Sequence, residues 1–259
     1  MDKEVCELIW EEANKYLLSI PGISEELIFI HINHYKISKP LSLNNVYFQL
    51  LTSLTNRHAF GRWIGDVYNL KEYYFNYDSK KVVSFYQNWK EIFNAIKNSD
   101  FYPPTKMDIS NSLNSWVKFC RGSLDGARFL SNFDNLKKFD EFVQSYIKEN
   151  KHIELANTIS NKIYGFGFSL SCDFLKELGY ADFVKPDIHI TDIFTNIRLC
   201  NSRKPEIIFT SLCDFARTLD ITPYEADKMF WLIGSGYFHL TQGSPRFKVN
   251  KYDFCNIVN

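Results

Sequence analysis

The sequence has no excess of charge of either sign, because 30 Lys and Arg residues balance 30 Asp and Glu residues over 259 positions. Proteins that bind nucleic-acid phosphates usually carry a basic excess, so any such surface here has to come from local arrangement and from backbone amides. Apolar runs of the roughly 18 residues that span a membrane are also missing, and residues 1–4 (MDKE) are not typical of a signal peptide. We therefore expect a cytoplasmic chain with no membrane partner.

Clustered metal ligands are missing as well. No two of the six cysteines are closer in sequence than Cys200 and Cys213, whereas zinc ribbons and iron–sulfur clusters need tighter groupings. His31 and His34 form an HxxH pattern, but residues 28–37 alternate like a strand, in which the two rings point to opposite faces. The sequence thus predicts buried, reduced thiols and no metal site.

Aromatic side chains are abundant, with 23 Phe, 15 Tyr and 5 Trp, and this composition excludes disorder and collagen-like repeats. Apolar residues recur every three to four positions along most of the chain, which indicates helices. Strand-like patterns are confined to residues 28–37 and 247–249. The helical segments are 4–18, 44–54, 81–96, 108–119, 135–149, 153–163, 169–178, 190–199, 204–218 and 222–233.

These patterns predict a mainly α protein of two helical lobes, with at most a small β element near the N-terminus. The pair Pro103-Pro104 interrupts the helical pattern and is the expected boundary. Residues 1–103 would then form a mainly helical N-terminal region with a short sheet, and residues 104–259 a helical core.

Two glycines one residue apart, Gly165 and Gly167, separate two of the helical segments. Such a pair permits a tight hairpin with positive φ angles and lets another backbone approach closely. The amides that open the second helix then face outward with the positive end of its dipole, and they can hold a phosphate without lysines. The alternative is an ordinary helix–turn–helix connection that merely needs glycine.

An aspartate follows this hairpin at a defined interval. Residues 184–190 read VKPDIHI, and Asp187 comes eighteen residues after Ser169, just before a new apolar helix. Over residues 155–200, the hairpin and the Asp-x-His helix start together resemble the helix–hairpin–helix (HhH-GPD) superfamily of DNA glycosylases.

The resemblance carries expectations about fold, partner and site. It implies a helix–hairpin–helix motif at residues 163–169 of the glycosylase-like core, and double-stranded DNA as the partner of a monomeric, nucleoid-associated enzyme. It also implies that the hairpin carbonyls can hold a monovalent cation, with no other cofactor. The residues expected to bind DNA are Gly165, Phe166, Gly167 and Ser169.

The resemblance also makes Asp187 the catalytic carboxylate. Cleavage of an N-glycosidic bond builds positive charge on the sugar, as in glycoside hydrolysis. A carboxylate near C1′ stabilises that charge and can orient or deprotonate the attacking water. The alternative is that Asp187 is only the N-cap of the following helix, and the two roles are compatible.

A lysine that the resemblance leads one to expect is absent. Superfamily members that also cleave the DNA strand use a lysine of the second helix as a Schiff-base nucleophile, and Ser169 stands at that position. Lys162, Lys176 and Lys185 are nearby in sequence, but none occupies the matching turn. Lys185 is the one that could approach from the Asp187 loop. We therefore predict a monofunctional enzyme that leaves an abasic site.

A glycosylase has to extrude its target base and hold it between aromatic or apolar walls. Trp231, in a helix that ends in Gly-Ser-Gly, and Trp63, close to Arg57 and Arg62, are candidates for those walls, although each could equally be an ordinary core tryptophan. Residues 121–128 read as a solvated polar connection. The charged residues of that segment are Arg121, Asp125 and Arg128.

The lack of a catalytic lysine slightly favours alkylated purines as substrate, since a positively charged base is already a good leaving group and one carboxylate with aromatic stacking suffices. 8-Oxoguanine, deaminated bases and hypermodified phage pyrimidines stay open. So do two other functions, a non-catalytic helix–hairpin–helix DNA-binding module and a helical interaction protein. Asp187 discriminates among them, because a pure binding module has no use for a carboxylate that faces DNA.

Overall fold

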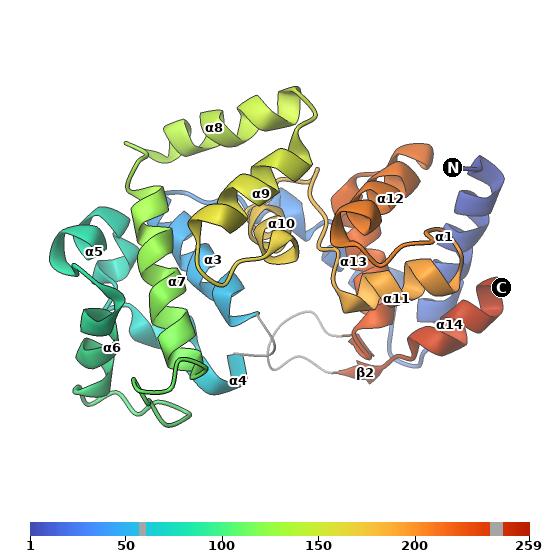
Figure 1. Ribbon diagram of the computed structural model, residues 1–259. Helices are drawn as coiled ribbons and strands as arrows, with labels where there is room; N and C mark the ends of the chain where they lie inside the picture. The colour runs from blue at the N-terminus through green and yellow to red at the C-terminus, as the bar shows by residue number, and fades with distance from the viewer. Residues whose placement is uncertain (57–60, 239–245) are drawn as a thin grey trace. The chain divides into compact units, whose positions relative to one another are not determined.

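The computed structural model describes residues 1–56, 61–238 and 246–259. The chain forms two compact units (Figure 1), of which unit 1 combines Met1–Lys39 with Leu175–Asn259 and unit 2 is Pro40–Phe174. The chain therefore leaves unit 1 and later returns to it. The predicted domain boundary at Pro103-Pro104 lies inside unit 2. Compact units and domains are not the same division of the chain, so that boundary stays a prediction.

Unit 2 is built of helices around α7 (Ser115–Leu130), which packs against α3, α5 and α6 (Figure 1). Helix α10 (Phe168–Glu177) contributes residues to both units. The other elements of unit 2 are α3 (Leu43–Thr55), α4 (Gly61–Ile64), η3 (Val67–Leu70), η4 (Phe75–Tyr77), α5 (Ser79–Phe85), α6 (Trp89–Lys97), α8 (Leu136–Lys148) and α9 (His152–Lys162).

Small side chains on one face of α7 let its neighbours approach closely. A Cβ on Gly122 would come within 2.5 Å of the carbonyl oxygen of Tyr164. Ser123 beside it is buried, and its hydroxyl accepts a hydrogen bond from the Tyr74 hydroxyl at 2.9 Å. The predicted solvated connection at residues 121–128 is therefore wrong, since this segment is the inner part of a helix and its glycine serves close packing.

Unit 1 is arranged around α13 (Pro223–Gly234), which packs against α1, α2, α11, α12 and α14. Figure 1 shows both chain termini in this unit, in α1 and α14, and these two helices contact each other. The other elements are α1 (Lys3–Leu18), α2 (Glu25–Ile32), η1 (His34–Lys36), α11 (Ile188–Asn196), α12 (Pro205–Thr218), β1 (Tyr237–Phe238), β2 (Phe247–Lys248) and α14 (Lys251–Val258).

Helix α13 begins where the sequence predicts. The Thr222 side chain accepts a hydrogen bond from the Glu225 amide at 3.2 Å, and the Glu225 carboxylate accepts one from the Thr222 amide at 2.7 Å. This capping box satisfies amides that a helix start otherwise leaves open. Farther along, the ring of Phe230 packs edge-on against Phe194 and at a steep angle to Phe215, with centroids 5.2 and 5.3 Å away.

The expectation of a β element near the N-terminus is wrong. Residues 28–37 form the end of α2 and the turn η1. The helical conformation is favoured over a strand because the Ser24 side chain caps α2. Two glutamates also lie in its first turn, at the positive end of the helix dipole. The strands of the described chain are an antiparallel pair in which Phe238 lies opposite Phe247, close to the predicted strand at 247–249. The mainly α fold class is confirmed.

His31 and His34 consequently do not lie on a strand, and the argument from opposite strand faces does not apply to them. His31 is buried on α2, whereas His34 belongs to η1 and its Nδ1 lies 2.8 Å from the Ser38 hydroxyl. Within the described ranges, no three His, Cys, Asp or Glu side chains are grouped so as to hold a metal ion.

No described helix is long and apolar enough to cross a membrane. None of the six cysteines, all described, forms a disulfide, and five are buried.

Candidate active site

The predicted hairpin, residues 163–169, joins α9 to α10 and includes the first residues of α10. Gly165 adopts a φ of +90°, in the left-handed region where a side chain is strained. The Phe166 amide donates a hydrogen bond to the Ile163 carbonyl at 3.1 Å, which closes the turn. Gly167 lies outside the left-handed region, so the expectation of positive φ at both glycines is wrong for this one.

The residues expected to bind DNA differ in exposure. Gly167 is exposed, and a Cβ at this position would meet no heavy atom within 4 Å, so its backbone is open to approach. Gly165 and Ser169 are half-buried, the latter in the first turn of α10. Phe166 is buried, with its ring 6.1 Å from that of Phe174. Its side chain therefore belongs to the core of unit 2, and only its backbone is left for a ligand.

Asp125 of α7 holds the start of the hairpin. Its Oδ2 accepts a hydrogen bond from the Tyr164 amide at 3.1 Å, and its Oδ1 lies 3.7 Å from Nη1 of Arg128. The guanidinium carbon of Arg121, one turn earlier, lies 5.0 Å from the centre of the Tyr164 ring and 5.2 Å from that of Trp89. The three charged residues of segment 121–128 thus form one face of α7 beside the hairpin.

Asp187 is the N-cap of α11 and has an extended backbone. Its Oδ1 accepts hydrogen bonds from the amides of His189 at 2.9 Å and Ile190 at 3.2 Å. The side chain is half-buried, and Oδ2 accepts no hydrogen bond from any residue that the structure describes. One carboxylate oxygen therefore fixes the orientation of the group, and the other is left for a ligand or a water molecule.

The loop before Asp187 is anchored by a buried ion pair. The Lys185 amide donates to Oδ1 of Asp227 at 2.8 Å, and Oδ2 of Asp227 lies 2.6 Å from Nζ of Lys176. Both side chains of the pair are buried. Burial raises the pKa of Asp227, and the attraction of Lys176 opposes that rise.

A second carboxylate adjoins this pair. Glu177 lies 2.8 Å from Nζ of Lys228 and 3.5 Å from Nζ of Lys176. Burial alone would raise the pKa of Glu177, but Lys228 and Lys176 outweigh it and lower this pKa to about 2. The end of α10 is thereby tied to α13 by charged side chains of both signs.

No protein-family model and no curated protein matches this sequence. A solved structure does match, that of a Methanocaldococcus jannaschii 8-oxoguanine glycosylase/lyase in complex with 15mer DNA containing 8-oxoguanine. The TM-score is 0.57 at 16% identity, and the match covers 90% of this chain and 99% of that chain. This chain therefore has the same fold as that glycosylase/lyase. The resemblance predicted from residues 155–200 is thus confirmed for the fold, and it extends over most of the chain.

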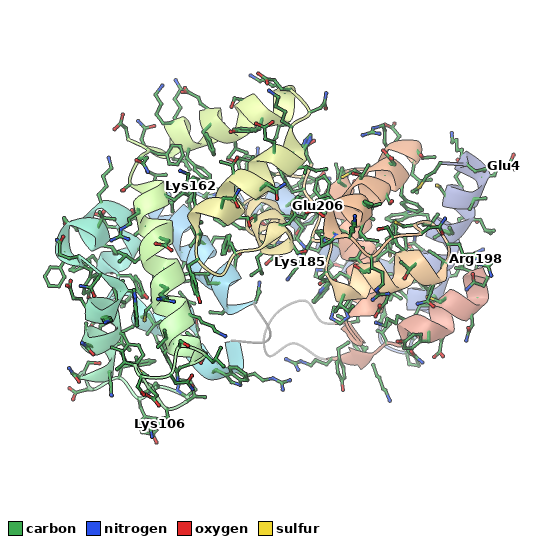
Figure 2. All side chains as sticks on the ribbon, viewed as in Figure 1. Glu4, Lys106, Lys162, Lys185, Arg198 and Glu206 are labelled. Carbon is green, nitrogen blue, oxygen red and sulfur yellow. The ribbon has the colours of Figure 1, made fainter. Side chains whose placement is uncertain are left out.

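In this fold, the three lysines near the hairpin have different surroundings. Lys162 is exposed at the end of α9, and Lys185 is half-buried on the loop that precedes α11 (Figure 2). Lys176 is buried in its ion pair with Asp227, so its ammonium group is not available as a nucleophile.

The two candidate wall tryptophans also differ. Trp63 is 45% exposed on the short helix α4. Trp231 is half-buried on α13, with its ring edge-on to that of His31 at 6.0 Å. Arg62 is exposed, and Arg57 lies outside the described residues.

The candidate residues belong to different units of the chain. Unit 2 holds the hairpin, Ser169 and Trp63, and unit 1 holds Asp187, Lys185 and Trp231. Sequence reasoning missed Asp227, although a signal was present, because this acid stands three residues from both Tyr224 and Phe230 on an apolar helix face. A carboxylate on such a face predicts a buried cationic partner.

Proposed function

We propose that this protein is a monofunctional DNA N-glycosylase that extrudes a damaged or modified base and hydrolyses its N-glycosidic bond, leaving an abasic site. The observation that carries the proposal is the arrangement of Asp187. In a chain with a glycosylase fold, two backbone amides fix one oxygen of this carboxylate, while the other accepts no hydrogen bond from the described residues.

Such a carboxylate matches the charge that the reaction develops. As the base leaves with the bonding electron pair, the sugar becomes cationic, and a negative charge held near C1′ lowers the barrier. Water then forms the new bond to C1′, and its proton passes to the Asp187 carboxylate as general base. The amides of His189 and Ile190 hold the group in one orientation before the substrate arrives, so little reorganisation is needed during the reaction.

In this proposal, the hairpin holds the DNA backbone through main-chain groups. The space at Gly167 supports it, because a Cβ there would meet no heavy atom within 4 Å, and an uncrowded position beside a helix start leaves room for a phosphate. The resemblance also implies a monovalent cation at the hairpin carbonyls. The Ile163 and Phe166 carbonyls each accept one hydrogen bond, which leaves each a second lone pair, and these are the groups that would hold such an ion.

The monofunctional assignment rests on the amines near the site. Ser169 stands where a Schiff-base lysine is expected, and a hydroxyl cannot form an imine with the sugar. Lys176 is engaged by Asp227 in a buried pair. Lys185 is the remaining amine on the Asp187 loop, and we assign it no chemical step.

For the substrate, we propose an alkylated purine, since its positive charge makes the base a good leaving group for a site with a single carboxylate. 8-Oxoguanine is the second candidate, supported by the fold shared with a glycosylase/lyase whose structure contains that lesion. The enzyme would work as a monomer on genomic DNA in the cytoplasm.

A panel of duplexes, each with one modified base, tests the proposal. The panel includes 7-methylguanine, 3-methyladenine, 8-oxoguanine, uracil and a glucosylated pyrimidine, and products are scored on denaturing gels with and without hot alkali. We expect strand breaks at one class of base after alkali and none before it. If the protein binds the duplexes but releases no base, the non-catalytic DNA-binding module is correct instead.

A further inference from the structure

The Arg121 side chain on α7 is held by two aromatic rings. Its guanidinium carbon lies 5.2 Å from the centre of the Trp89 ring and 5.0 Å from that of Tyr164. Cation–π contact of this kind fixes the plane of a guanidinium and covers its faces, whereas the N–H groups at its edge stay able to donate in the plane.

No anion among the described residues balances this arginine. Within the described residues, Arg121 forms neither a hydrogen bond nor an ion pair. The nearby carboxylate of Asp125 is engaged elsewhere, because its two oxygens face the Tyr164 amide at 3.1 Å and Arg128 at 3.7 Å. The guanidinium edge is therefore oriented and available.

These side chains surround a pocket of about 220 Å³ that opens to solvent. Arg128 forms part of its rim and donates a hydrogen bond to the Gln87 carbonyl at 2.9 Å, which places a second guanidinium there. Asn88 and Leu124 complete the lining. We call this site the arginine pocket, and it consists of Asn88, Trp89, Arg121, Leu124, Asp125, Arg128 and Tyr164.

The pocket adjoins the hairpin through Tyr164, which is one of its walls and directly precedes Gly165. Gly167 is the third residue after Tyr164, and three residue steps span at most about 11 Å. Phosphates on one DNA strand rise about 3.4 Å per nucleotide. A strand held at Gly167 therefore has other phosphates within reach of Arg121.

We propose that the arginine pocket binds a backbone phosphate of the DNA strand that the hairpin holds, through the edge of the Arg121 guanidinium. This inference rests on the proposed function, and it adds a charged contact that the neutral composition of the chain hides. A phosphodiester fits the donor set because a guanidinium offers it two parallel N–H groups, and the strand arrives at the pocket already tethered by the hairpin. The contact carries no base preference, so it strengthens binding to any sequence.

Arg121→Gln tests the inference, with Arg217→Gln as the matched control. Arg217 is exposed and pairs with Asp214 on its own helix, so its substitution removes the same charge without touching the arginine pocket. The probe is a duplex with one stable abasic-site analogue, and affinity is measured over a range of salt concentrations. We expect Arg121→Gln to bind about 10-fold more weakly and to show a salt slope smaller by about 0.9, the value for one lost phosphate contact. Arg217→Gln keeps the wild-type affinity and slope.

A methylphosphonate scan locates the phosphate. Each duplex of the scan replaces one charged phosphate by a neutral group. We expect one position at which the wild type loses about 10-fold in affinity and Arg121→Gln loses nothing further. Arg121→Lys, which keeps the charge but not the planar fork, should keep the wild-type salt slope and fall between the two in affinity.

The inference is overturned if Arg121→Gln keeps wild-type affinity and slope, or if the scan gives wild type and variant the same profile. Thermal melting of each variant shows whether it is folded. If Arg121→Gln is not, the scan is run with Arg121→Lys, which should lose less affinity than the wild type at the located phosphate. The wild type distinguishes the two proposals. If it fails to bind duplexes or to release any base, the proposed function has failed, whereas normal wild-type behaviour with an unaffected Arg121→Gln contradicts the arginine pocket alone.

Discussion

The ammonium nitrogen of Lys176 lies 2.6 Å from Oδ2 of Asp227, with both side chains buried. The second oxygen of Asp227 accepts the Lys185 amide at 2.8 Å, and the Lys185 carbonyl in turn accepts the Asp187 amide at 2.8 Å. A single carboxylate on α13 thus connects α10 to the loop that carries the candidate catalytic residue. Asp227 is a positioning residue, since it reaches the site through Lys185.

Asp227→Asn should strongly destabilise the protein. Its amide oxygen can still accept the Lys185 amide, but the buried ammonium group of Lys176 loses its counter-charge. Breaking a buried pair by removing one partner typically costs about 3–5 kcal/mol, and we expect the lower end because Glu177 lies 3.5 Å from the same nitrogen. Urea denaturation measures the loss. The double variant Lys176→Met with Asp227→Asn should recover most of it, and equal stabilities of single and double variants would contradict the assigned pair.

Stability should fall in acid through Glu177. In the unfolded chain a glutamate titrates near roughly 4.3, whereas Lys228 and Lys176, acting against burial, lower the pKa of Glu177 to about 2 in the folded protein. A depressed carboxylate pKa stabilises the fold fully above the unfolded value, and this contribution disappears as the pH falls through the folded value. The urea concentration at the midpoint of unfolding should therefore fall as the pH is lowered from about 4.3 to about 2. Glu177→Gln should flatten the decline, whereas Glu72→Gln, which makes the same change at an exposed acid, serves as control.

The two hairpin glycines should respond differently to substitution. Gly165→Ala places a side chain at a φ of +90° and should cost about 1–2 kcal/mol of stability. Gly167→Val points into open space, so its stability should stay within about 1 kcal/mol, while its β-branched side chain obstructs the approach to the hairpin amides and weakens duplex binding. Melting and titration with duplex DNA separate the two effects. Undiminished binding by folded Gly167→Val would remove the hairpin from the interface.

Features with local causes were predictable from the sequence. The capping box at Thr222 and the hairpin at Gly165 both depend on residues within four positions of one another, so one segment contains the whole signal. The same is true of Asp187, which caps α11 as its place before an apolar helix predicts. The aspartate interval from Ser169 then sufficed to identify the fold.

Features that depend on distant partners were missed. The sequence around Gly122 is typical of a polar connection, yet the segment lies within α7, where the carbonyl of Tyr164, 42 residues later in sequence, packs against Gly122. Asp227 pairs with Lys176, which lies 51 residues earlier in the sequence, and neither residue alone indicates the pairing. At residues 28–37 two local signals conflicted, and the Ser24 cap outweighed the apolar alternation.

Borohydride trapping tests the monofunctional assignment. Incubation with substrate and borohydride should leave no covalent protein–DNA adduct, because Ser169 has no amine and Lys176 is held in its buried pair. Denaturing electrophoresis provides the readout. If an adduct forms, the assignment is wrong, and loss of the adduct in Lys185→Ala but not in Lys162→Ala would identify the amine responsible.

Asp187→Asn tests the catalytic role itself. The amide oxygen of asparagine can accept the same bonds from His189 and Ile190, so α11 should keep its cap and the melting temperature should barely change, with a loss within about 1 kcal/mol. The substitution removes the charge that would face the developing cation. Electrostatic contributions of this kind are worth about 2.7–4 kcal/mol, so base release in single turnovers should slow by about 100- to 1000-fold.

Binding and a matched control distinguish this effect from damage to the fold. Loss of a carboxylate near phosphates should leave the affinity of Asp187→Asn for duplex DNA equal or tighter, because a repulsion is removed. Asp182→Asn makes the same charge change at an exposed acid of the preceding loop, and it should release base at the wild-type rate. The combination that supports the enzyme is slow chemistry with unchanged melting and undiminished binding. If Asp187→Asn releases base as fast as the wild type, Asp187 is a helix cap only, and the catalytic group has to be sought elsewhere in the fold.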